Sequence, residues 1–99
     1  MEKRRFKEDV YNHVYQRTRN RFNIFYDPCD FLSYYSIFGV MAVRYAIQAL
    51  GLCLMIDHIH MLVRAKDRKT LSSFVSSVTS VFVRQYNEDI GRIGPLFEE

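Results

Sequence analysis

The chain has 99 residues, 48% of them hydrophobic and 15% aromatic, which suits the packed core of one small domain spanning 1–99 and excludes a disordered chain. Fourteen Lys and Arg against eleven Asp and Glu give a net charge of +3, which is compatible with polyanion binding but does not require it. No apolar stretch reaches the roughly 20 residues of a membrane span. The charged N-terminus lacks the apolar core of a secretory signal. We therefore expect a cytoplasmic protein without a membrane partner, in which Cys29 and Cys53 are buried free thiols.

The first half of the chain predicts a strand, a polar loop and a helix. Residues 10–17 alternate apolar and polar side chains as an amphipathic strand does, and residues 18–25 are typical of a polar loop. Asp27 followed by Pro28 indicates a helix start, because aspartate caps the first turn and proline suits the first helical position. The helix is expected to end near Arg44. Its apolar side recurs at steps of three and four residues: Phe31, Tyr35, Phe38, Met41, Ala42 and Tyr45.

A pair of histidines lies in the next segment. Residues 47–63 are strand-like and too long for one strand, so a turn is expected at Ile56-Asp57, with His58 opening a second strand. Side chains i and i+2 of a strand share a face, so His58 and His60 project together while Ile59 points the other way. Two imidazoles so placed can hold one divalent metal. Histidines on half-buried strands are also commonly satisfied by hydrogen bonds alone, and the spacing leaves both interpretations open.

A second helix follows a charged loop at 65–69. We expect it to begin near Thr70, to run to about Ile90 and to end at Gly91, which suits a left-handed C-terminal position. A last strand is expected from Ile93 to Phe97. The buried stripe of the helix comprises Leu71, Phe74, Val75, Val78, Phe82, Tyr86 and Ile90.

The order strand, helix, strand, strand, helix and a short final strand predicts an α+β fold. It is the ferredoxin-like split βαβ arrangement, with two helices on one face of an antiparallel sheet. The histidine strand would then be central, and its histidine face would lie on the side that the helices leave open. Clusters of basic residues at strand ends, around Arg17, Arg19 and Arg21 and again from Arg64 to Lys69, would suit phosphate contacts or simply be solvated.

Several ordered segments resemble the single-tyrosine HUH transposases, the group of REP-associated tyrosine transposases and insertion-sequence-type transposases. The resemblance covers about residues 11–98. It begins with His13-Val14-Tyr15-Gln16-Arg17-Thr18 and continues with Ile24-Phe25-Tyr26-Asp27. The histidine strand, residues 54–63, is similar to the family's histidine–hydrophobic–histidine strand. Tyr86-Asn87, Gly91-Arg92 and Gly94-Pro95-Leu96-Phe97 resemble the family's exit from the second helix.

The resemblance implies a DNA transposase domain that acts on single-stranded or hairpin DNA, as a homodimer. In such enzymes a tyrosine hydroxyl attacks a phosphodiester and leaves a 5′-phosphotyrosine. It implies that His58 and His60 hold Mg²⁺ or Mn²⁺, with a third oxygen ligand completing the site. The candidate phosphate-binding side chains are Arg17, Arg19, Arg64 and Arg92.

The chain departs from this family in two respects. The nucleophilic tyrosine is expected on a further helix beyond Glu99, so the chain is interpreted as C-terminally truncated, with no catalytic tyrosine of its own. Tyr86 is expected on the buried stripe of the second helix, and His13 is expected to be structural. The family usually has Pro-Asn where this chain has Ile56-Asp57, and Asp57 either makes the hairpin turn or adds a carboxylate near the metal.

Other functions stay in competition. A non-catalytic DNA-binding remnant would keep the fold and the basic loops. Histidine-triad hydrolases need a third alternating histidine where Leu62 stands, and two-histidine phosphoesterases need a His-x-Thr motif twice, so both fit poorly. A purely structural homodimerisation module is the last alternative.

Overall fold

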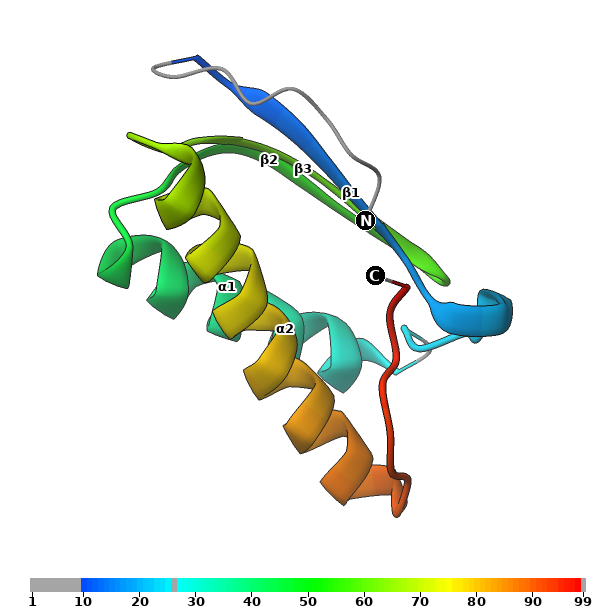
Figure 1. The fold of residues 1–99 in the computed structure, drawn as a ribbon. Coiled ribbons are helices and arrows are strands. Elements are labelled where there is room, and N and C mark those ends of the chain that lie inside the picture. The colour runs from blue at the N-terminus through cyan, green and yellow to red at the C-terminus, as the bar shows by residue number, and fades with distance from the viewer. Residues whose placement is uncertain (1–9, 26, 99) are drawn as a thin grey trace.

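The computed structural model of the protein describes residues 10–25 and 27–98. Within them, a three-stranded antiparallel sheet forms one layer and two helices cover one of its faces (Figure 1). This arrangement confirms the predicted α+β class with two helices on one side of the sheet. In chain order the elements are β1 (Asn12–Arg17), the 3-10 turn η1 (Arg19–Arg21), α1 (Pro28–Arg44), β2 (Gln48–Met55), β3 (His58–Arg64) and α2 (Arg68–Ile90).

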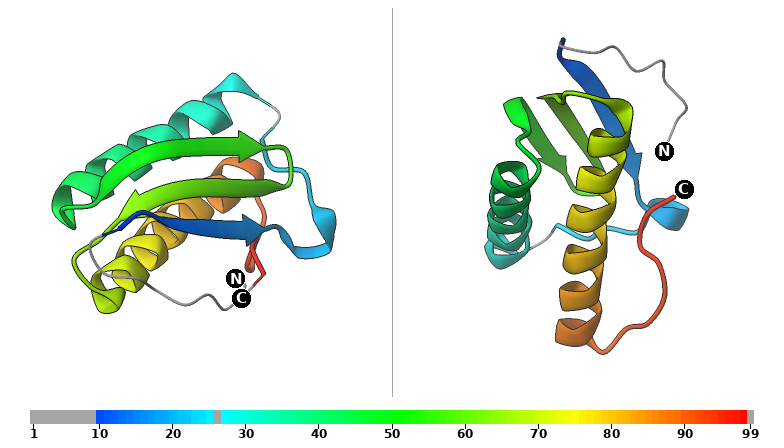
Figure 2. Two further views of the ribbon diagram at one scale, coloured as in Figure 1. Left: turned by 90° about the horizontal axis from the view of Figure 1, so that it is seen from above. Right: turned by 60° about the vertical axis from the view of Figure 1, so that its left-hand side comes forward.

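The strand that carries the histidine pair lies in the centre of the sheet. The order is β1-β3-β2, with β3 antiparallel to both neighbours, as seen from above in Figure 2. The β2–β3 hairpin turns at Ile56-Asp57, and His58 opens β3, both as predicted. The end of β1 anchors this turn, because the backbone N–H and the hydroxyl of Thr18 both donate to the carbonyl of Asp57, at 3.0 and 3.1 Å.

The two faces of β3 have opposite characters. Ile59, Met61 and Val63 are buried against the helices, with at most 1% of each exposed. His58 and His60 alternate with them and are half-buried on the other face. The period of two in a strand therefore puts both histidines on the face that the helices leave open, as predicted.

The capping box of α1 confirms the predicted start of this helix. The Asp27 carboxylate accepts from the Cys29 N–H at 2.9 Å, and Asp30 accepts from the Asp27 N–H at 3.2 Å. The predicted apolar stripe was wrong at one position. Tyr34 is fully buried and Tyr35 is 46% exposed, because neighbouring residues are 100° apart on a helix and only one of the two tyrosines can face the core.

Helix α2 begins two residues before the predicted Thr70. The Asp67 carboxylate accepts from the Thr70 N–H at 2.7 Å and so caps a helix that begins at Arg68. Gly91 ends it with φ +69°, as predicted. Ile90 was predicted to be buried and is 53% exposed. At about 1.5 Å per residue, α2 is longer than the strands beneath it, so its last turn has no sheet to pack against.

The C-terminal arm, residues 92–98, does not form the predicted strand. It makes one bridge, between Thr18 and Phe97, and the N–H of Glu98 donates to the carbonyl of Arg17 at 2.8 Å. Gly94 has φ +98° and Pro95 has no N–H, so the backbone reaches the sheet edge only at the end of the arm. Leu96 and Phe97 are nevertheless buried and close one end of the core.

No helix in the described ranges is long and apolar enough to cross a membrane. Cys29 and Cys53 are both exposed, so the expectation of buried thiols was wrong. Cys29 lies in the first turn of α1, and Cys53 lies on β2 opposite His60. Both side chains point away from the core between the sheet and the helices.

Candidate functional site

The open face of the sheet brings polar and aromatic side chains of β1 and β3 together. In the strand register, Tyr15 lies opposite His60 and Arg17 lies opposite His58. His13 shares this face of β1, because it alternates with Tyr15 and Arg17. We expected His13 to be structural, and its ring contacts one member of the histidine pair, His60. Sequence spacing could not reveal this contact, because the two strands are far apart along the chain.

The first of the paired histidines is oriented by its neighbour in the hairpin turn. Nδ1 of His58 lies 2.8 Å from Oδ1 of Asp57, and both side chains are largely buried, with 26% and 20% exposed. An ionised carboxylate can only accept, so Nδ1 of His58 donates, and in the neutral ring the lone pair is then on Nε2. Asp57 therefore lies in the hairpin turn, as one of its two alternatives predicted, and its carboxylate also contacts His58. A carboxylate near a metal stays a prediction.

The second histidine is surrounded by rings. Nδ1 of His60 lies 2.9 Å from Nε2 of His13. The ring of His60 is 5.0 Å from that of Tyr15 and 4.9 Å from that of His58, measured between centroids, and the last pair is perpendicular at 86°. Three imidazoles and one phenol thus form a continuous cluster on the sheet surface.

The donor set on this face fits a partial metal site. Among residues 10–25 and 27–98, no three His, Cys, Asp or Glu side chains are placed to hold a metal together. The cluster can therefore supply two imidazole nitrogens, one from His58 and one from His60, and would leave the other coordination positions to oxygen ligands. Imidazole suits Mn²⁺ better than the harder Mg²⁺, so of the two predicted ions the donor set favours Mn²⁺.

The predicted DNA-binding arginines occupy different places. Arg17 lies on the histidine face, where its guanidinium pairs with Glu98 at 3.1 Å, and these hydrogen bonds raise the pKa of Arg17 above its ordinary value. Arg64 ends β3 on the same face, and Arg19 is exposed in η1. Arg17 and Arg64 lie at opposite ends of this face, opposite the start and at the end of β3. Contact of any of the three arginines with DNA stays a prediction.

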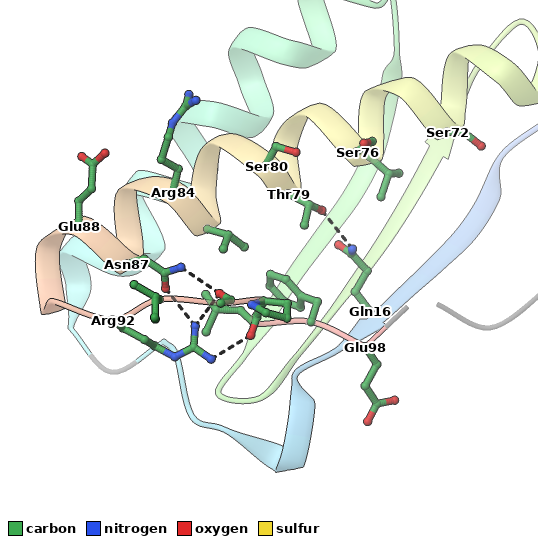
Figure 3. Close-up of a pocket in the computed structure, with 17 residues that line it drawn as sticks. Gln16, Ser72, Ser76, Thr79, Ser80, Arg84, Asn87, Glu88, Arg92 and Glu98 are labelled. Atoms are coloured by element: carbon green, nitrogen blue, oxygen red, sulfur yellow. Dashed lines mark hydrogen bonds between the residues drawn. The ribbon is translucent and has the colours of Figure 1, made fainter.

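Arg92 is not brought to the histidines. Its guanidinium donates to the Asn87 side chain at 3.0 Å and to the carbonyls of Gly94 and Pro95 at 3.0 and 2.8 Å, and it lies over the Phe22 ring. These bonds brace the C-terminal arm against α2 (Figure 3). A role in DNA binding stays a prediction for Arg92, and its visible role is structural.

A groove of about 830 Å³ opens on the helix side of the sheet, between α2 and the C-terminal arm. Figure 3 shows Gln16 reaching into it from β1 and donating to the Thr79 hydroxyl, at 3.2 Å. Gln16 and Arg17 alternate on β1, so the sheet separates this groove from the histidine face. The groove is therefore not part of the candidate metal site.

The sequence matches the family model described as "Transposase IS200 like" over residues 6–95. The chain belongs to the IS200-like transposase family. No curated protein matches its sequence. The crystal structure of a protein from Deinococcus radiodurans, described as a transposase, is similar with a TM-score of 0.67 and 20% identity. The match covers 90% of this chain and 68% of that one, and at this identity it shows a shared fold.

The family assignment confirms the resemblance that the histidine strand and its flanking segments carried. The structure also shows where three of the tyrosines lie. Tyr86 is 8% exposed and packs against Phe82, as predicted, and Tyr34 is fully buried. The Tyr15 ring lies beside those of His58 and His60, with centroids 5.7 and 5.0 Å away.

Proposed function

We propose that this member of the transposase family binds single-stranded or hairpin DNA on the open face of its sheet, with Mg²⁺ or Mn²⁺ held by His58 and His60. The observation that carries the proposal is the bond of 2.8 Å between His58 Nδ1 and Asp57 Oδ1. Metal-binding histidines usually donate their second nitrogen to such a carboxylate, which fixes the ring and raises its basicity.

The chemistry we infer is transfer of a DNA phosphoryl group to a tyrosine. When bound, the cation would polarise the scissile phosphate and offset the charge that develops on it. The tyrosine oxygen would form a bond to phosphorus while the bond to the 3′-oxygen breaks, and the proton lost by tyrosine would return through water to that oxygen. Arg17 lies opposite His58 and Arg64 lies further along the same face of β3, and both would hold flanking phosphates. Tyr34 and Tyr86 are buried in the core and do not suit this role.

The ligand assignment can be tested with Mn²⁺, whose binding is followed by its electron paramagnetic resonance signal. His58→Ala and His60→Ala should each weaken binding at least about 10-fold, because each removes one of two protein ligands. Tyr11→Ala, just before β1, is the control and should bind Mn²⁺ with the affinity of the unaltered protein. Equal affinity in all four proteins would contradict the assignment.

A DNA-binding function without cleavage is the second candidate. It is favoured because, in the described ranges, no three His, Cys, Asp or Glu side chains are placed to hold a metal together. A labelled hairpin with a single-stranded flank distinguishes the two candidates. A complex that resists denaturation and yields phosphotyrosine supports transfer, whereas a gel shift that denaturation abolishes supports binding alone.

We also propose that the chain forms a homodimer, as the family resemblance implies. Light scattering during size-exclusion chromatography should then give twice the monomer mass of 11.8 kDa. A mass of one chain at micromolar concentration would contradict this part of the proposal.

A further inference from the structure

We propose that His13 is a positioning residue for the metal site. It accepts a hydrogen bond from Nδ1–H of His60 and so directs Nε2 of His60 to the metal. The inference rests on the proposed role of His58 and His60 as ligands. It adds to them a residue from a different strand, 47 positions away along the chain.

The geometry of the two rings is that of an N–H···N hydrogen bond. Nε2 of His13 and Nδ1 of His60 are 2.9 Å apart. The ring planes differ by only 21° with centroids 5.0 Å apart, so the two rings are nearly parallel where the nitrogens meet. In the register His13 lies opposite Leu62, which makes His60 its diagonal neighbour across the sheet. Diagonal positions are within reach of aromatic side chains.

The direction of this bond decides whether His60 can be a ligand. If His13 donates through Nε2–H, the proton of His60 is on Nε2 and this nitrogen cannot bind a metal. If His60 donates through Nδ1–H, the lone pair is on Nε2 and points away from the shared bond. Metal binding is compatible only with the second form, and His13 then keeps its own proton on Nδ1. The exposed ring of His13 can share that proton with water.

The two ligands are then held in the same way by different parts of the fold. Asp57 holds Nδ1 of His58 from the hairpin turn, and His13 holds Nδ1 of His60 from β1. The Tyr15 ring lies beside both, with centroids 5.7 Å from His58 and 5.0 Å from His60, and limits rotation of both rings. Both imidazoles therefore present the same kind of nitrogen, Nε2.

The first test needs no metal. Long-range ¹H–¹⁵N correlation spectra at neutral pH show which ring nitrogen of each histidine carries its proton. In the unaltered protein the proton of His60 should be on Nδ1. In His13→Ala the spectrum should move to a mixture of the two forms, whereas in His13→Gln the amide oxygen can replace the lost acceptor. A proton found on Nε2 of His60 in the unaltered protein, or no change in His13→Ala, would overturn the inference.

The second test measures Mn²⁺ affinity in the same variants. His13→Ala should weaken binding about 10-fold, in the usual range for groups that orient a ligand. His13→Gln should recover most of the loss, and Tyr11→Ala, two residues earlier, should show none. If His58→Ala and His60→Ala lose affinity but His13→Ala does not, the role of His13 alone is refuted. If none of the variants loses affinity, the ligand assignment itself fails and the role of His13 with it.

Discussion

Asp57 combines two functions because it occupies the turn directly before a candidate ligand. Its carbonyl accepts from the backbone N–H and the hydroxyl of Thr18, and its carboxylate contacts His58. The first set of bonds ties the hairpin to β1, and the second fixes one imidazole. Asp57 therefore holds the hairpin turn in place through its carbonyl and orients His58 through its carboxylate.

The two functions of Asp57 can be separated by substitution. In Asp57→Asn the amide oxygen still accepts from His58 Nδ1 and asparagine still suits a turn, so Mn²⁺ affinity should fall only slightly. In Asp57→Ala the acceptor is lost and affinity should fall about 10-fold. Mn²⁺ titration measures both, with circular dichroism as the control for folding. Equal affinity of the alanine and asparagine variants would show that the carboxyl group does not orient His58.

The candidate site could be predicted from sequence only where its residues are close in the chain. The spacing of His58 and His60, with apolar residues between them, was enough to place both on one face. The part of His13 in the cluster could not be foreseen, because it depends on the register between β1 and β3. Turn chemistry at Asp57 was foreseen, but the direction of its carboxylate depends on a side-chain torsion that no sequence pattern reports.

At the scale of elements, both helices are defined by their end residues. Predictions succeeded where a cap was local and strong, as at Asp27 and Gly91. They failed where several apolar residues competed for one face. Tyr34 and Tyr35 are chemically identical, and only the packing of the Tyr34 ring against Phe25 and Phe82 distinguishes them.

The cap of α2 makes one contribution to stability depend on pH. The N–H of Thr70 lowers the pKa of Asp67 below its ordinary value. A lowered folded-state pKa stabilises the protein above the unfolded pKa of about 3.9, and this stability is lost as the pH falls through the folded value. The melting temperature of the protein should therefore exceed that of Asp67→Asn at pH 7 and approach it near pH 2. A difference that stays constant over this range would contradict the prediction.

Replacing Gly39, inside α1, and Gly91, at the end of α2, with alanine should change the unfolding free energy in opposite directions. A Cβ added at Gly91 or at Gly39 would meet no atom within 4 Å, so alanine clashes with no neighbour at either position. Gly91 has φ +69°, and alanine there should cost about 1 kcal/mol of unfolding free energy. Gly39 lies inside α1, where alanine should stabilise by roughly 0.5–1 kcal/mol. Urea denaturation measures both changes, and equal signs would contradict the argument.

At the scale of the whole molecule, aromatic side chains connect the elements. Phe25 from the loop before α1, Tyr34 from α1 and Phe82 from α2 lie within 6 Å of one another between ring centroids. All three are at most 2% exposed. Because each comes from a different segment, this cluster joins the first loop and both helices into one core.

Truncating the Phe82 side chain should destabilise the entire domain. Phe82→Ala removes a side chain that is 1% exposed and should cost about 3–5 kcal/mol of unfolding free energy, through lost burial and the cavity left behind. Val43→Ala, at a position 84% exposed, should change stability by less than about 0.5 kcal/mol. Chemical denaturation followed by circular dichroism compares the two. A small effect of Phe82→Ala would mean that the core can collapse around the loss.

The central place of β3 also sets an order of assembly. The β2–β3 hairpin is local and carries His58 and His60, whereas β1 must close a loop of about forty residues to bring His13. Local pairings generally form before distant ones, because less chain entropy is lost. The histidine pair should therefore exist on a nascent hairpin before its third imidazole arrives. Pulsed hydrogen exchange during refolding would show this as protection of β2 amides ahead of those of β1, and simultaneous protection would contradict it.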